Sequence, residues 1–102
     1  VSFEEQLTAV AKLVKEGKVR YVGLSNESPY GVMEFLEAAR RLGLPEVVSV
    51  QNCYNLLYRN EMDMGLTEVC SPRHENLGLI CYSPLAGGVL TGKYMFKGRA
   101  LN

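Results

Sequence analysis

The sequence predicts an α/β fold in which about three parallel β/α units form part of a barrel. Three short apolar runs alternate with helical patterns at intervals of roughly 30 residues, the length of one βαβ unit. Each run ends in polar residues, at positions 25–26, 51–52 and 82–85. Because the carboxyl ends of parallel strands point to one side, where ligands bind, these positions predict one composite site.

The two faces of the predicted strands favour a barrel over an open, doubly wound sheet. Side chains alternate across a strand. One face is wholly apolar and is expected to meet the helices; it carries Val22, Leu24, Val48, Val50, Leu79 and Cys81. The other face is smaller and turns polar at its end, where Ser25, Gln51 and Tyr82 are the last residues of their strands. A barrel interior has this pattern, whereas a doubly wound sheet is apolar on both faces.

The first helix is expected from Ser2 to about Glu16. Ser2 and Glu5 have the spacing of a capping box, in which each side chain satisfies an amide at the helix start. Apolar residues then recur with helical period, and Gly17 is a natural stop. The β-rich run at 19–24 that follows is interpreted as a strand.

The second helix is expected to begin at Ser28, because Pro29 is tolerated in the first turn. Gly43 and Pro45 mark its end. Its buried stripe is predicted to consist of Val32, Leu36, Ala39 and Leu42. The second strand is expected at 47–50.

The segment 55–76 has a weaker pattern. Leu66, Val69 and Cys70 fit a short helix capped by Asp63, which Pro72 either breaks or restarts. The third strand is expected at 79–82. A glycine-punctuated loop is expected at 87–92, followed by a loose polar tail at 97–99.

Composition narrows the classes of function. The 102 residues contain 11 Lys plus Arg and 11 Asp plus Glu, so the net charge is zero. A neutral chain argues against nucleic acid or an anionic membrane as the main partner, because both require a basic surface. No apolar run has the length of a membrane span, and the first residues do not form a signal peptide. The absence of an initiator Met suggests a segment cut from a longer chain.

The cysteine pattern indicates a reducing compartment such as the cytoplasm. Cys53, Cys70 and Cys81 are odd in number and have no CxxC spacing. They are interpreted as core thiols, and no metal site is predicted, because zinc sites need clustered ligands.

The strand-end residues have the chemistry to bind a nicotinamide. Asn26 and Gln51 offer carboxamides that can donate to the carbonyl of a ligand amide and accept from its NH2 group. Tyr82 offers a flat face on which an aromatic ring can stack. A structural interpretation is also open, in which Asn26 starts a turn, Gln51 bonds to backbone and Tyr82 is a core residue.

The loop after the third strand is a candidate phosphate site. It contains Ser83, Leu85 and Gly87, and backbone amides of a glycine-containing loop can turn toward phosphate oxygens. Lys93 follows and adds positive charge, although a lone Lys between glycine and tyrosine is usually solvated. The loop is neither a Walker A motif nor GxGxxG. His74, the only histidine, is expected on the surface.

Segments 22–26, 50–59 and 82–94 together resemble the aldo-keto reductases, in the branch with potassium-channel β subunits and Tas-like oxidoreductases. The resemblance implies a TIM (β/α)8 barrel that binds NADP(H), of which this chain resembles strands five to seven. It implies that Ser25, Asn26 and Gln51 hold the nicotinamide carboxamide and that Tyr82 stacks on the ring. Pyrophosphate and neighbouring phosphates would lie along a further set of residues, namely Ser83, Leu85, Gly87 and Lys93.

The resemblance also implies a reaction and a limit. The family reduces aldehydes or ketones by hydride transfer, so a small-molecule carbonyl is the expected substrate. Its catalytic Asp, Tyr, Lys and His lie on earlier strands, so no residue here is expected to be catalytic, and the isolated chain is expected to be inactive. The alternative is a non-catalytic, cofactor-binding regulatory subunit similar to the channel β subunits. Three strands cannot close a barrel, so self-association through open strand edges is expected.

Overall fold

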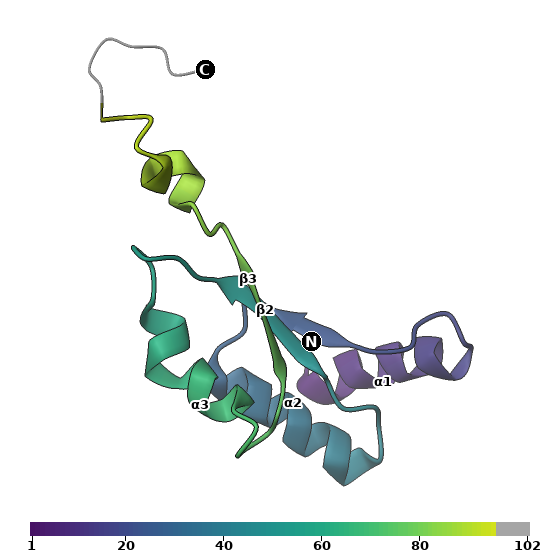
Figure 1. Ribbon diagram of the computed structural model, residues 1–102. Coiled ribbons are helices and arrows are strands. Elements are labelled where there is room, and N and C mark those ends of the chain that lie inside the picture. Colours follow the sequence, from purple (N-terminus) through teal and green to yellow (C-terminus); the bar gives the residue numbers. More distant parts are fainter. Residues whose placement is uncertain (96–102) are drawn as a thin grey trace.

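The computed structural model describes residues 1–95 (Figure 1). The expected loose tail at 97–99 lies outside these residues. The elements are, in order, α1 (Phe3–Lys15), β1 (Gly23–Ser25), α2 (Pro29–Leu42), β2 (Ser49–Cys53), the π-helix η1 (Met62–Leu66), α3 (Thr67–Cys70), β3 (Gly78–Tyr82) and the 3₁₀-helix η2 (Ala86–Thr91).

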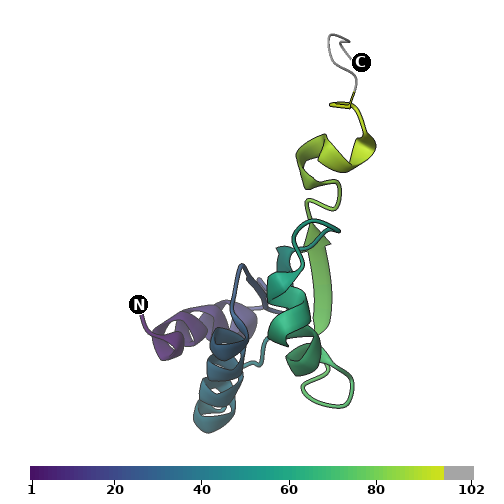
Figure 2. The same cartoon turned by 90° about the vertical axis from the view of Figure 1, so that its left-hand side faces the viewer.

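The three strands form one parallel sheet in the order β1-β2-β3. In both views the helices α1, α2 and α3 lie on the same side of this sheet (Figures 1 and 2). The register pairs Leu24 with Val50 and Val50 with Leu79, so one apolar row crosses all three strands. A parallel sheet covered by helices on one face confirms the predicted partial β/α barrel.

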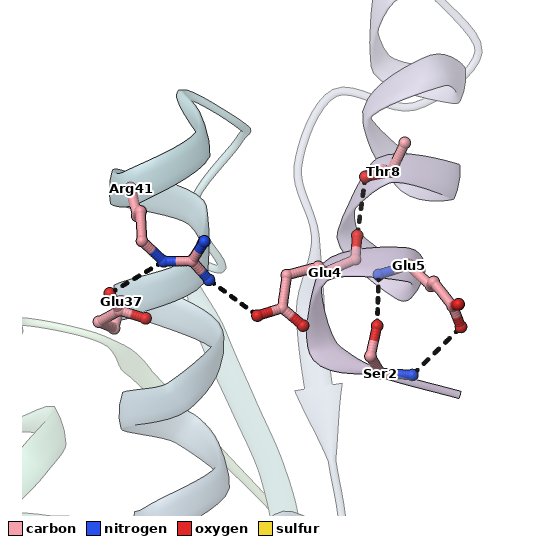
Figure 3. A network of polar contacts seen from close by, with 6 residues as sticks. All are labelled: Ser2, Glu4, Glu5, Thr8, Glu37 and Arg41. Carbon is pink, nitrogen blue, oxygen red and sulfur yellow. Dashed lines mark hydrogen bonds and ion pairs between the residues drawn. The ribbon is translucent and has the colours of Figure 1, made fainter.

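The start of α1 is set by local polar contacts. The capping box is confirmed: the Glu5 amide donates to Ser2 Oγ at 3.0 Å, and the Ser2 amide donates to Glu5 Oε2 at 3.3 Å (Figure 3). Arg41 of α2 then reaches Glu4 at 2.7 Å and Glu37 at 3.2 Å. These ion pairs are exposed, so they align α1 with α2 and add little stability.

The ends of α2 agree with prediction, but its buried face is wider than predicted. Ser28 caps the first turn, and Gly43 ends the helix in the left-handed conformation. The expectation that Leu42 is buried is wrong, because its side chain is 44% exposed. Phe35 and Ala38 are buried instead, because α1 packs against that side of α2 through Leu7 and through an edge-on contact of Phe3 with Phe35.

The main core lies between the sheet and the helices α2 and α3. Its fully buried members come from α2, β2, η1 and the approach to β2: Val32, Leu36, Val47, Val50, Met62 and Leu66. Burial of such side chains stabilises the fold by about 1.5–3 kcal/mol each. This core holds the carboxyl ends of the strands in place from the helix side.

The boundaries of all three strands differ from prediction, because pairing with neighbours determines them. The first strand is shorter than the predicted 19–24, and the second begins at Ser49 and extends past Val50 to Cys53. Val48 was predicted to face the helices but is 44% exposed, whereas Val47, just ahead of β2, is buried. The third strand begins one residue earlier than predicted, at Gly78.

The helical segments after β2 and β3 were only partly predicted. Helix α3 ends at Cys70, before Pro72, and Leu66 and Cys70 are buried as expected. Asp63 is not a helix cap; its carboxylate pairs with Arg59 at 2.8 Å. The predicted glycine loop contains the helix η2, which is kinked where two glycines have positive φ.

Candidate functional site at the strand ends

The carboxyl ends of β1 and β2 place three of the predicted residues side by side. Ser25 pairs with Gln51 in the sheet register, and both side chains are exposed on the face opposite the helices. The ladder continues one residue further, since the Asn26 amide donates to the Gln51 carbonyl at 3.0 Å. The structure therefore brings a hydroxyl and two carboxamides to one edge of the sheet.

Tyr82 joins these residues from the far side of β2. Its hydroxyl donates a hydrogen bond to Oδ1 of Asn26, although the two residues lie 56 positions apart in sequence. Because β1 and β3 flank β2, this bond crosses β2 on the open face. The prediction that Gln51 is the last residue of its strand is wrong: β2 continues two residues further, to Cys53, which pairs with Tyr82.

The segment 83–95, which we call the arm, leaves the sheet at the end of β3. In both views it extends beyond the strand ends, away from the helices (Figures 1 and 2). Leu85, Gly87 and Lys93 lie in it and are exposed. The Lys93 side chain folds back over Gly88, where an added Cβ would lie 2.8 Å from Nζ. The arm thus presents an ammonium group beside a glycine turn.

Left-handed backbone conformations gather at the strand ends. Among the described residues, positive φ outside glycine occurs at four positions, and Asn26, Ser83 and Ala86 are three of them. Asparagine tolerates this conformation, whereas serine and alanine are strained there by about 1–2 kcal/mol. Strained residues persist where the surroundings hold them, and they cluster at ligand sites.

Sequence reasoning did not predict the role of Asn52. Its side chain is fully buried on the helix side of β2. Nδ2 donates to the Glu27 carbonyl at 3.0 Å and to Glu61 Oε2 at 3.1 Å, and Oδ1 accepts from the Glu27 amide at 3.2 Å. Side chains two positions apart in a strand lie on the same face, so the burial of Val50 was the signal for the burial of position 52.

Asn55 was also missed, and it lies 7% exposed in the turn after β2. Its Oδ1 accepts from the amides of Leu57 and Tyr58, each at 2.9 Å, and its Nδ2 donates to the Ser83 carbonyl at 3.0 Å. Nearby, the Tyr58 hydroxyl donates to Glu61 at 3.2 Å, which raises the pKa of that tyrosine. Asn52 and Asn55 thus connect the three strand ends through their side chains.

The remaining candidates do not add to this site. His74 is exposed, and its Nδ1 lies 2.6 Å from the Glu68 carbonyl, away from the strand ends. The three cysteines are free, but the interpretation of all three as core thiols is wrong, because Cys81 is exposed and Cys53 is only half-buried. Cys70 is buried, and burial raises the pKa of its thiol. In the part of the chain that the structure describes, no cluster of His, Cys, Asp or Glu has the makeup of a metal site. Nor does any helix within residues 1–95 combine the length and apolarity needed to cross a membrane.

Parallel strands with polar carboxyl ends at one edge, under helices on the opposite face, define the class of β/α-barrel proteins. The whole chain, residues 1–102, matches the aldo/keto reductase family. The chain belongs to this family.

Three relatives illustrate the similarity. An aldo-keto reductase of Babesia bovis is 46% identical over 93% of this chain and 33% of its own length. Protein tas of Escherichia coli K12 is 44% identical over 93% of this chain and 27% of its own length. L-glyceraldehyde 3-phosphate reductase of the same strain is 38% identical over 90% of this chain and 26% of its own length. The chain therefore spans no more than about a third of these relatives.

Proposed function

We propose that this chain holds the nicotinamide and pyrophosphate side of an NADP(H) site in an oxidoreductase that reduces aldehydes or ketones. Membership of the aldo/keto reductase family supports the oxidoreductase class. One relative is named as a reductase of an aldehyde, L-glyceraldehyde 3-phosphate. The observation that carries the proposal is the hydrogen bond from Tyr82 to Asn26, because it joins a stacking ring to an amide-reading side chain across β2.

The polar groups at the strand ends fit a primary carboxamide. The Tyr82 hydroxyl donates to Oδ1 of Asn26. The Nδ2 group of Asn26 then serves as the donor to a ligand carbonyl. The exposed Gln51 carboxamide and Ser25 hydroxyl supply further donors and acceptors at the same edge. Tyr82, half-buried at the end of β3, offers its ring to a nicotinamide.

The arm fits the phosphate part of the cofactor. Ser83 and Gly87 have positive φ, and alternation of left-handed with right-handed residues can turn successive backbone amides toward one anion. Lys93 Nζ beside Gly88 places a positive charge next to this turn. Ser83, Leu85 and Gly87 would line the pyrophosphate, with Lys93 near the phosphates.

NADPH, when bound, supplies the hydride. The residues of this chain bind and orient, and none is proposed as catalytic, so the chain alone is expected to show no turnover. The natural setting is proposed to be a reducing compartment such as the cytoplasm, because all three cysteines are free thiols. A small-molecule carbonyl is the proposed substrate.

The proposal is tested by titrating the complete polypeptide, expressed from its whole coding sequence, with NADPH and separately with NADH. We expect saturable binding of NADPH, weakened about tenfold by Tyr82→Ala or Gln51→Ala. Tyr21→Ala is the matched control, since Tyr21 is an exposed tyrosine ahead of β1, at the opposite end of the sheet. No saturable binding of either nucleotide would contradict the proposal. Binding without reduction of any aldehyde in a panel would favour the regulatory alternative.

Self-association through open strand edges is a second part of the proposal. Within the described residues β1 and β3 each have one neighbour, and exposed strand edges are templates for pairing with another chain. Sedimentation of the 102-residue chain alone is expected to show concentration-dependent association. A monomer with a cooperative urea transition would refute this part.

A further inference from the structure

The carbonyl groups at the start of the arm are held by the turn that follows β2. The Tyr54 amide donates to the Tyr82 carbonyl at 3.2 Å, and Asn55 Nδ2 donates to the next carbonyl, that of Ser83, at 3.0 Å. The Ser83 carbonyl also accepts from the Ala86 amide at 3.1 Å, which closes the first turn of the arm. The direction in which the arm leaves β3 is therefore determined where Asn55 contacts Ser83.

The side chain of Asn55 is itself locked in orientation. Oδ1 receives the amides of Leu57 and Tyr58 at 2.9 Å, and backbone bonds of 3.2 Å link Asn55 and Tyr58 in both directions. Rotating the carboxamide by half a turn would place its NH2 group against two amides and its oxygen against the Ser83 carbonyl. Only one orientation satisfies all its partners, so Nδ2 is aimed at Ser83.

We propose that Asn55 is a positioning residue for the cofactor site, because its amide holds Ser83 in the left-handed conformation from which the arm is aimed. This inference rests on the proposed function, in which Ser83 and the arm line the pyrophosphate. Among the described residues, no hydrogen bond joins Asn55 to the proposed nicotinamide groups or to Lys93, so it acts through Ser83. A serine with φ 55° is strained, and the bond from Asn55 is an interaction that offsets the strain.

Replacement by aspartate separates the two tasks of this side chain. Asn55→Asp keeps an oxygen for the amides of Leu57 and Tyr58 but replaces the donor aimed at Ser83 with a second oxygen. When ionised, that oxygen repels the Ser83 carbonyl. When protonated, the carboxyl group has one O–H that can donate to it again. The defect should therefore depend on pH in a way that general loss of packing does not.

The experiment is to measure the Kd for NADPH of the complete polypeptide, wild type and Asn55→Asp, from neutral to acidic pH. Each value is divided by that of wild type at the same pH, because the cofactor phosphates also titrate. We expect binding about tenfold weaker for Asn55→Asp at neutral pH, approaching wild type as pH falls. Asn60→Asp, an exposed position in the same connection, adds the same charge and is expected to bind as wild type.

A ratio close to one at every pH would overturn the proposal, and so would a loss that does not change with pH. If wild type itself binds no NADPH, the proposed function fails, and hydrogen exchange then tests the positioning role separately. Faster exchange of the Ala86 amide in Asn55→Asp supports it, and an unchanged rate overturns it. If Asn55→Asp does not fold, the test is the hydrogen-exchange rate of the side-chain amide protons of Asn55 in the wild-type protein. Exchange as fast as that of an exposed amide would show that these protons do not bond to Ser83 and would overturn the proposal.

Discussion

The helix-covered face of the sheet and the arm differ in what their apolar side chains contact. Under the helices, Leu36 is 1% exposed and Leu66 is fully buried. In the arm, Leu85 is 54% exposed and Val89 is 52% exposed. The covered face is thus stabilised by packing within the described residues, whereas the arm is directed by hydrogen bonds at its first residues.

This difference indicates that the two proposed parts of the cofactor site are stabilised in different ways. Packing on the helix side fixes the strand ends, where the nicotinamide is proposed to bind. The arm, where the pyrophosphate is proposed to bind, has the low density of buried contacts that is typical of regions with low local stability. Binding energy is then expected to order the arm more than the sheet.

The largest expected effect on stability comes from a matched pair of leucine truncations in the complete polypeptide. Leu36→Ala should lower the free energy of unfolding by about 2–5 kcal/mol, because it leaves a cavity in the core. Leu85→Ala should change it by no more than about 0.5 kcal/mol, because the side chain is exposed in the arm. Urea denaturation measures both. Similar losses of stability in the two variants would contradict the claim that the covered face is packed and the arm is not.

The next effect concerns the buried amide that joins β1 to β2. Asn52→Ala should cost about 1–3 kcal/mol, because the amide and carbonyl of Glu27 lose their side-chain partner in a buried setting. Asn60→Ala is the control, as that asparagine is exposed. Equal stability of Asn52→Ala and Asn60→Ala in urea would show that the covered face does not depend on this connection.

A smaller effect is expected where η1 approaches α2. A Cβ at Gly65 would lie 2.7 Å from Cγ of Pro29, a ring that cannot rotate away. Gly65→Ala should therefore cost about 1–2 kcal/mol through overpacking. The same substitution in a Pro29→Ala background should cost less, because the obstructing ring is gone. Equal costs in both backgrounds, measured by thermal and urea unfolding, would refute the close packing.

The smallest effect on stability is expected from removing an ion pair on the helix-covered side. Arg40 lies 2.5 Å from Glu75, and this hydrogen bond lowers the pKa of Glu75 below its usual value. The pair stabilises the fold fully above the unfolded pKa of the carboxyl group, and this contribution is lost as pH falls through the lower folded pKa. Arg40 is half exposed, so Glu75→Gln should cost less than about 1 kcal/mol at neutral pH.

The pH dependence of that difference supplies the check. Stability of wild type and Glu75→Gln should converge when the pH falls below the folded pKa, because both side chains are then neutral. A gap that persists unchanged into acid would mean that the pair is not responsible.

Local signals explain which parts of the fold were predictable. The capping box at Ser2, the proline start of α2 and its Gly43 stop are short-range patterns, and all are present in the structure. Strand limits were less accurate because the pairing of β2 with both neighbours extends it to Cys53. The width of the buried face of α2 depends on where α1 packs, which no local pattern contains.

In the candidate site, too, local features could be predicted from the sequence and contacts between distant residues could not. The polar strand ends could be predicted because they follow apolar runs directly. The roles of Asn52 and Asn55 could not, because their partners Glu27 and Ser83 lie 25 and 28 residues away and are brought near only by the sheet. The bond between Tyr82 and Asn26 likewise requires the parallel register.

Hydrogen exchange of the complete polypeptide with and without saturating NADPH tests the account most directly. We expect amides of the arm, residues 83–93, to gain much more protection than those of α2, with a smaller gain at 25–26 and 51–53. That result would mean that the cofactor lies along the strand ends and orders the arm. Bound NADPH with no added protection in the arm would contradict the account.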